Sequence, residues 1–383
     1  MRGKEEPGRD SVPLHQEIEN ELAERIRSGE LVAGRKLPPE LKLADEFQVS
    51  RTTIRHALIS LESKGLVERI HGRGTFVADK TGKKRERSGE ERSIYAIVPH
   101  LTSSFTGTII MGAQEELYAK GYHLSVLPTN DDPQKEMDYL RIILESRAGG
   151  VLLQPTKSEY YNPVVTELIQ QGIPLVMMGR YYRFVNCSYV DGHNYQGAYD
   201  AIAYLVGLGH EKIGLVTKKP LIHTSLEDRI QGYRDAMADH GLAILPQTLL
   251  MDLADSRNVY WDSASATYEQ EIVNRLVDYL EAAPEMTAVF ALNDRIAGDL
   301  IKAAKHCGRV VGRDLSIVGF DNVSLSESLD PPLTTIDAPT FAVGKRAAEI
   351  LLDHMANEQS EPTKEHLPMH LVIRDSCGPN PRE

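Results

Sequence analysis

Apolar residues in the first 80 positions recur at helical spacing and then give way to two short apolar runs. In one stretch every fourth residue is apolar, which predicts an amphipathic helix. Its apolar face consists of Leu14, Ile18, Leu22 and Ile26. A second helix is expected to open at Leu37-Pro38-Pro39-Glu40, since proline is tolerated in a first helical turn. A third helix is predicted over about residues 51–64, after the N-capping residue Ser50.

The predicted third helix carries polar and basic residues at its start. Arg51, Thr52 and Arg55 fall outside its apolar face. In a helix-turn-helix protein these first residues reach base edges, where arginine pairs with guanine through two hydrogen bonds. Residues 66–70 and 75–77 predict two strands joined by His71-Gly72-Arg73-Gly74. The pattern favours a DNA-binding winged helix-turn-helix, and leaves open a three-helix domain whose surface hairpin binds protein.

From Ile94 onward the pattern changes to short apolar runs that alternate with helical stretches. Runs such as IYAIVP, GVLLQP, TAVFAL and SIVGF are each followed by a stretch with helical spacing. This alternation predicts an α/β fold, with parallel sheets covered by helices on both faces. About 290 residues are too many for one small sheet, so two Rossmann-type lobes are expected. Ligands in such folds bind at the carboxyl ends of the strands.

Polar and aromatic side chains follow several of these predicted strands. They include amide, carboxylate, guanidinium and aromatic groups, which together suit a polyhydroxylated ligand, because sugar hydroxyls bind charged and amide groups in pairs. The candidate residues are Phe105, Gln154, Arg180, Tyr181, Arg229, Trp261, Asn293 and Asp321. Ordinary structural roles stay open for some of them: Asp321 as a turn cap, Arg229 as the partner of a nearby acid, and Trp261 as a core residue.

The net charge of −12 is unevenly distributed along the chain. Residues 1–92 carry 19 Lys and Arg against 17 Asp and Glu, whereas the remainder carries 24 against 38. Within the first part, residues 51–92 hold 11 basic and 6 acidic residues. Only this segment is suited to neutralise DNA phosphates, because the acidic remainder repels them.

Other classes of protein find no support in the sequence. The sequence contains no apolar run of the roughly 18 residues that span a bilayer. Its charged first residues lack the apolar region of a secretory signal. The three cysteines are far apart, which suits a reducing cytoplasm and no metal or disulfide site. No HExxH, GxSxG, Walker or CxxC motif is found. We expect a cytoplasmic protein that is no enzyme, binds no membrane and carries no metal or cofactor.

The run LPPELKLADEFQVSRTTIRHALISLESKGLVERIHGRGTFV resembles the winged helix of the GntR family almost without gaps. This resemblance implies a set of DNA contacts in the second helix, the third helix and the hairpin tip. The implied residues are Pro39, Glu40, Ser50, Arg51, Thr52, Thr53, Arg55, His71, Gly72, Arg73 and Gly74. Leu41 departs from the family, many members of which carry arginine there, so a phosphate contact is either lost or supplied by Lys42.

Residues 93–376 resemble the effector domain of the LacI/GalR family, which is itself similar to periplasmic sugar-binding proteins. The resemblance lies in GLGHEKIG, RIQGY, ALNDRIAGDLI, DLSIVGFDN and DPPLTTID. It implies that Arg229, Asn293 and Asp321 contact the ligand, with Phe105 and Trp261 packing on it. Strand four departs from members that place an aspartate at its end, since Gly179-Arg180-Tyr181 stands there.

The two resemblances together predict a DNA-binding domain over residues 1–78, a flexible linker over 79–92 and a two-lobed effector domain over 93–376. This pairing is similar to that of the arabinose repressor family. It implies a repressor that binds a palindromic operator as a homodimer and is released by a small sugar, arabinose or a related monosaccharide. A non-sugar effector such as a purine, or an effector that acts as a corepressor, remains the alternative.

Overall fold

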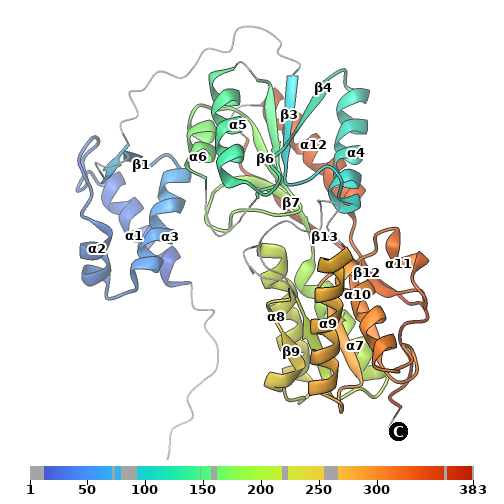
Figure 1. Cartoon of the computed structure of the whole chain (residues 1–383). Coiled ribbons are helices and arrows are strands. Elements are labelled where there is room, and N and C mark those ends of the chain that lie inside the picture. The colour runs from blue at the N-terminus through green and yellow to red at the C-terminus, as the bar shows by residue number, and fades with distance from the viewer. Residues whose placement is uncertain are drawn as a thin grey trace, which may run out of the picture. The chain divides into compact units, whose positions relative to one another are not determined.

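The chain divides into two compact units (Figure 1). The structure is a computed structural model, and it describes residues 13–70, 74–78, 93–146, 148–156, 162–217, 223–253, 266–357 and 360–381. The first unit comprises Met1–Gly89, Asn162–Ile173 and Arg183–Cys187. The second comprises Glu90–Tyr161, Pro174–Tyr182 and Ser188–Glu383. The predicted linker over residues 79–92 lies outside the described residues.

The first unit contains the predicted helices and hairpin. Its elements are α1 (Leu14–Arg27), α2 (Glu40–Phe47), α3 (Arg51–Ser63), β1 (Val67–Ile70), β2 (Gly74–Val77) and α6 (Pro163–Gln170). The strands β1 and β2 pair antiparallel, with Val67 opposite Val77. The core forms where α1, α2 and α3 meet, around Leu22, Leu43, Ile54 and Leu58, each at most 1% exposed. The second helix begins at Glu40, with Pro39 as its N-cap in an extended conformation, so the prolines precede the first turn and do not lie in it. Pro39 keeps Pro38 out of the helix, because the residue before a proline is disfavoured in the helical region.

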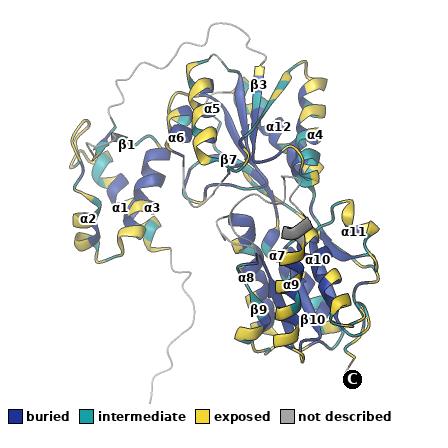
Figure 2. Ribbon diagram, viewed as in Figure 1, coloured by how far each residue is buried: buried dark blue, intermediate teal, exposed yellow. Residues whose placement is uncertain are grey.

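The second unit contains two six-stranded sheets, as the alternating pattern predicted. The first sheet is entirely parallel, in the order β13-β7-β6-β5-β3-β4. Its strands are β3 (Ser93–Val98), β4 (His123–Pro128), β5 (Gly150–Leu153), β6 (Leu175–Met178), β7 (Ser188–Gly192) and β13 (Lys364–Leu367). Both faces of β5 and β6 are buried (Figure 2), which explains why these strands read as continuous apolar runs.

The second sheet has the order β14-β12-β11-β10-β8-β9, and only β14 runs antiparallel to its neighbour. Its strands are β8 (Ile213–Val216), β9 (Leu249–Leu250), β10 (Ala288–Ala291), β11 (Ser316–Asp321), β12 (Thr334–Asp337) and β14 (His370–Val372). Successive side chains of a strand point to opposite faces. Accordingly Val289 and Ile317 enter the core on one face, and Phe290 and Val318 the core on the other.

Helices cover both sheets and complete their cores. They are α4 (Ser104–Ala119), α5 (Pro133–Glu145), α7 (Asn194–Gly207), α8 (Thr224–Asp239), α9 (Ala266–Ala282), α10 (Asp294–His306), α11 (Leu325–Ser328) and α12 (Thr340–Ala356). The helices α4 and α12 share a core with the first sheet, and α7 and α8 share one with the second. Glycine is required where α12 meets α4, because a Cβ on Gly344 would lie 1.8 Å from the carbonyl oxygen of Ile109.

The chain crosses between the two sheets three times within the second unit. It crosses from β7 to α7, from β12 to α12, and from β13 to β14. The last residues return to the second sheet, where Gly378 N donates to Ser316 Oγ at 3.0 Å and Asn380 N donates to Leu208 O at 2.9 Å. Packing contacts of this domain therefore continue past the predicted end at residue 376.

Candidate DNA-binding and effector sites

The start of α3 presents exposed arginines around a single carboxylate. Arg51 Nε lies 2.8 Å from Glu40 Oε2, and the Arg51 side chain remains 63% exposed. Arg55 Nη2 and Arg69 Nη2 lie 3.5 and 3.4 Å from the same carboxylate. Burial raises the pKa of Glu40, but the Arg51 hydrogen bond and the charges of Arg55 and Arg69 outweigh it and lower the pKa. Glu40 thus joins three basic side chains from α3 and β1 on one surface, a grouping that sequence spacing did not predict.

The structure describes five of the remaining predicted DNA contacts, namely Pro39, Ser50, Thr52, Thr53 and Gly74. Ser50 caps α3 by accepting a 3.1 Å hydrogen bond from Thr53 N, as predicted, while Pro39 and Thr52 are exposed. Gly74 adopts φ +111°, in the region that favours glycine. His71, Gly72 and Arg73 lie outside the described residues. Leu41, where the family pattern departs, is 65% exposed.

Arg229 is the centre of the predicted effector residues on the second sheet. Its guanidinium is buried and donates to Asn194 Oδ1 at 2.9 Å, Leu292 O at 2.7 Å and Asp321 Oδ1 at 2.9 Å. It also lies 3.7 Å from the centroid of the Phe320 ring. The structure therefore brings Arg229 and Asp321 together from positions 92 residues apart. This interaction fixes Arg229 in one orientation at the carboxyl end of the strands.

Asn293 begins α10 as its N-cap. Its Oδ1 accepts a 2.9 Å hydrogen bond from Ile296 N, which satisfies one of the free donors of the first turn. Its neighbour Leu292 supplies the carbonyl bound by Arg229. The side-chain oxygen of Asn293 therefore has a structural role, and a ligand contact by this residue stays a prediction.

On the first sheet, Gln154 presents a buried donor without a described partner. Its side chain is fully buried and its Oε1 accepts a 3.0 Å hydrogen bond from Thr106 Oγ1, whereas its Nε2 has no hydrogen-bond partner among the described residues. A Cβ on Gly179 would lie 3.4 Å from this Nε2 and 3.6 Å from Phe105 Cε1. Gln154 and Phe105 are therefore close together. Gln154 Nε2 is a buried donor for which the described residues provide no acceptor, and such donors usually have one.

The pKa of Arg180 is shifted by charged residues that lie in or after strands of both sheets. Its Nη1 donates to Pro155 O at 3.3 Å. Burial lowers the pKa of Arg180, while Asp131, Asp191 and Asp321 raise it and Arg229 lowers it further. The predicted residues Arg180, Arg229 and Asp321 thus form one electrostatic group.

Asp191 belongs to this group although the sequence reading did not select it. It is 3% exposed at the end of β7, and it accepts hydrogen bonds from Gly192 N at 2.7 Å and Asn194 Nδ2 at 3.1 Å. Burial raises its pKa to about 7, against the opposing effects of the Gly192 hydrogen bond and of Arg229. The signal was an aspartate directly after a short buried strand, the same position that singled out Asp321.

Glu136 is a second buried carboxylate that the sequence reading missed. From α5 its Oε2 accepts from Thr156 N at 2.6 Å, and its Oε1 accepts from Tyr182 Oη at 2.8 Å. It thereby ties together the segments after β5 and β6, which carry Gln154 and Arg180. A lone glutamate in an amphipathic helix offers no signal of such a role.

Two other predicted ligand residues are less directly placed. The Tyr181 ring is 7% exposed and stacks on Tyr189, with centroids 4.0 Å apart and an angle of 5° between planes. Its ring is therefore occupied by core packing, and a ligand contact stays a prediction. Trp261 lies outside the described residues.

A cavity of about 490 Å³ opens between the start of α4, the start of α12 and the carboxyl ends of β11 and β12. Its lining includes Ser104, Phe105 and Thr108 from α4, with residues 321–324 and 337–342. The volume falls within the range of small-molecule pockets, roughly 300–1,000 Å³. Both a predicted aromatic residue, Phe105, and a predicted carboxylate, Asp321, line it.

Comparisons with known proteins agree with both units. Residues 14–77 match bacterial regulatory proteins of the gntR family, and residues 202–377 match the periplasmic binding protein-like domain. An arabinose metabolism transcriptional repressor of Geobacillus stearothermophilus is 30% identical over 89% of this chain and 91% of that protein. The transcriptional repressor CytR of Escherichia coli K12 is 28% identical over 87% and 94%. The structure of a transcriptional regulator CelR–cellobiose complex shares the fold, with a TM-score of 0.65, 23% identity and coverage of 86% and 92%.

The fold and these matches define a transcriptional regulator in which a GntR-type DNA-binding domain precedes a periplasmic binding protein-like domain. The chain belongs to the family of the arabinose metabolism transcriptional repressors. No helix among the described residues is both long and apolar enough to cross a membrane.

Proposed function

We propose that this chain represses transcription by binding a palindromic operator as a homodimer, and that a small neutral sugar releases it. L-arabinose or a closely related monosaccharide is the proposed effector, because the relative from Geobacillus stearothermophilus is named for arabinose metabolism. The observation that carries the proposal is the buried group in which Arg229 pairs with Asp321 and both act on Arg180 together with Asp191. Gln154, whose Nε2 has no acceptor among the described residues, adds a neutral donor on the first sheet.

The charges of this group favour an uncharged ligand. Arg229 forms an ion pair with Asp321, and the negative charges of Asp131 and Asp191 raise the pKa of Arg180. A phosphate or carboxylate ligand would have to compete with carboxylates already near both guanidinium groups. Neutral hydroxyls instead both donate and accept, so they satisfy the Gln154 amide and the carboxylates together. The Phe105 ring supplies an apolar surface for the C–H face of a sugar.

The effector would act by favouring one arrangement of the two sheets. A ligand that contacts both sides of the cavity binds more tightly to the arrangement in which all its contacts form. In a twofold dimer, this change alters how two α3 helices meet the two halves of a palindrome. Operator affinity then falls, and the operator weakens sugar binding by the same factor.

Titration of the operator with the full chain tests this proposal. Operator affinity is measured without ligand and with saturating L-arabinose, other pentoses, hexoses and a purine nucleoside. Release by L-arabinose alone, or by one close pentose, supports the proposal. Release by the nucleoside alone makes the effector a non-sugar ligand, and tightening by a sugar makes it a corepressor. If no ligand changes operator affinity, the induction mechanism is wrong.

A further inference from the structure

The backbone at Asp321 and Asn322 is held in an unusual conformation. Both residues have positive φ values, +105° and +50°, which residues other than glycine rarely adopt. Such a conformation persists only where surrounding contacts over-determine it, and it occurs often at functional sites. Asp321 contacts Arg229 in the proposed effector group, so the turn that carries Asp321 is itself part of that site.

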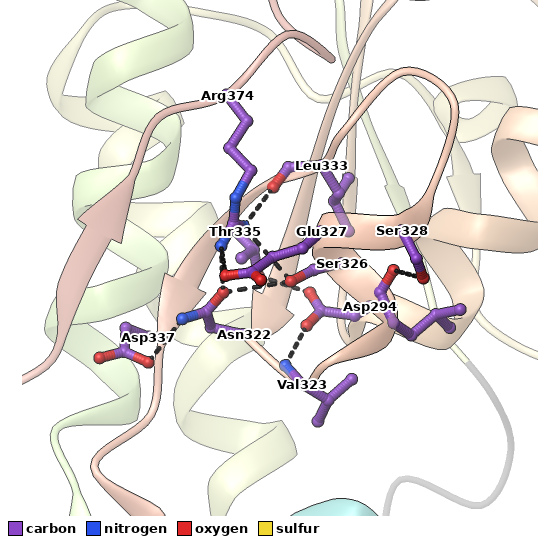
Figure 3. A network of polar contacts seen from close by, with 11 residues as sticks. Asp294, Asn322, Val323, Ser326, Glu327, Ser328, Leu333, Thr335, Asp337 and Arg374 are labelled. Carbon is purple, nitrogen blue, oxygen red and sulfur yellow. Dashed lines mark hydrogen bonds and ion pairs between the residues drawn. The ribbon is translucent and has the colours of Figure 1, made fainter.

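The side chain of Asn322 makes hydrogen bonds in two directions (Figure 3). Its Nδ2 donates to Asp337 Oδ1 at 2.8 Å. Its Oδ1 accepts from Arg374 Nη2 at 2.9 Å and from Ser326 Oγ at 3.1 Å. Donor and acceptor are therefore both used, which fixes the orientation of the amide. Asn322 is thus tied to strand β12 on one side and to the segment after β14 on the other.

One of these partners, Asp337, lies where the chain crosses between the sheets. Asp337 is the last residue of β12 and begins the segment that leads into α12. Ala338, the next residue, donates a 3.5 Å hydrogen bond from its N–H to Asp321 O. Arg374 follows β14, the strand that the third crossing enters, and its Nη1 also donates to Leu333 O at 2.8 Å. The second crossing is therefore joined to the Asp321 turn through Asp337 and Ala338, whereas Arg374 lies at the end of β14 away from the third crossing.

The same residues line the cavity. Asp321, Asn322 and Asp337 lie on its wall together with Phe105 from α4. A ligand that occupies the cavity therefore acts on the turn and on the start of a crossing at once.

We infer that Asn322 is a positioning residue that transmits effector binding at Asp321 to the crossing segment at Asp337, with Arg374 holding its amide in place. This inference rests on the proposed function, because it assigns the route by which the sugar acts. It predicts that losing the Asn322–Asp337 hydrogen bond changes the coupling between sugar and operator more than it changes sugar affinity.

A reciprocal exchange tests this hydrogen bond in the full chain. Asn322→Asp keeps an oxygen for Arg374 and Ser326 but replaces the donor toward Asp337 with a second carboxylate. Adding Asp337→Asn to this variant restores a hydrogen bond of reversed polarity with the same total charge. Glu327→Gln is the matched control, since Glu327 bonds Arg374 at 3.1 Å in the same network but is 74% exposed and does not contact Asp337.

Two measurements are made on each variant. The ratio of operator affinities without and with saturating L-arabinose should fall at least about fivefold in Asn322→Asp, against typical coupling factors of about 5–150. Sugar affinity measured by calorimetry should fall by a smaller factor than this ratio. The amide of Ala338, followed by hydrogen exchange without ligand, should exchange at least about fivefold faster. The double exchange restores both values, and Glu327→Gln changes neither.

Specific outcomes overturn the inference. Wild-type coupling in Asn322→Asp refutes it, as does a loss of sugar affinity with coupling retained, which would make Asn322 only a ligand contact. Unchanged exchange at Ala338 also refutes it. Because exchange is measured without effector, this last result stands even if no sugar releases the wild-type chain, an outcome that refutes the proposed function separately.

Discussion

Asp294 offers a test of how burial shifts the pKa of a carboxyl group in this domain. It is 1% exposed at the start of α10, where its Oδ2 accepts from Val323 N at 2.8 Å and its Oδ1 lies 2.5 Å from Thr335 Oγ1. Burial and the charge of Asp321 raise its pKa from 3.8 to about 8, against the Thr335 and Val323 hydrogen bonds and Arg229. The carboxyl is therefore protonated in the folded protein at neutral pH.

Asp294→Asn should remove a pH-dependent loss of stability. Above about pH 5 the unfolded chain has released this proton while the folded chain still holds it, so folding is favoured at low pH and loses free energy as pH rises toward 8. One proton corresponds to about 1.4 kcal/mol per pH unit, or roughly 2.7 kcal/mol between pH 5.5 and 7.5. Asparagine imitates the protonated carboxyl, since its amide donates toward Thr335 while its oxygen accepts from Val323 N.

Urea unfolding of the full chain, followed by circular dichroism at pH 5.5, 6.5, 7.5 and 9, measures this effect. The free energy of unfolding of Asp294→Asn, minus that of the wild type, should rise with pH up to about 8 and then level off. Asp314→Asn is the control: hydrogen bonds from Arg313 and from Val310 N lower the pKa of the Asp314 carboxyl to about 2, so it stays ionised throughout. A difference for Asp294→Asn that is flat across this range refutes the reasoning.

Three further substitutions test the other parts of the structure. Arg51→Ala should weaken operator binding about 10- to 100-fold in a gel-shift titration, because one guanidinium contact to a base pair contributes about 1–3 kcal/mol. Sugar affinity should be unchanged, and an operator affinity equal to that of the wild type would show that Arg51 does not contact the operator. Gln154→Leu should lower sugar affinity at least about tenfold by calorimetry, since a donor buried beside the ligand is lost; full affinity would exclude a contact there. Gly344→Ala should lower stability by about 3 kcal/mol in urea unfolding, because its Cβ would overlap Ile109 O; a wild-type transition would contradict the packing of α12 on α4.

The local pattern of the sequence was sufficient for the winged helix. Apolar spacing predicted a third helix over about residues 51–64, and α3 spans Arg51–Ser63 with Ser50 as its cap. A helix and its cap are formed by residues three or four apart, so the chain encodes them locally. The same holds for the alternation of strands and helices after Ile94, where burial on both faces makes each strand a continuous apolar run.

The polar sites required the tertiary structure. Arg229 and Asp321 were each predicted from their place after a strand or in a motif, but their 2.9 Å ion pair depends on how β11 lies beside α8 in space. Glu40 was predicted as a DNA contact, yet its role as the shared partner of Arg51, Arg55 and Arg69 appears only when α2, α3 and β1 are packed.

Glu136 and Asn322 mark the limit of sequence reading most clearly. Their partners are specified by the register of parallel strands and by the crossings between the sheets, which bring Asn322 beside Asp337 and Arg374 from 15 and 52 residues away. The sequence by itself determined which segments become helices and strands, because those choices are made between near neighbours along the chain. Only the tertiary structure decided which polar groups meet, because burial and hydrogen bonding act between residues that are neighbours in space alone.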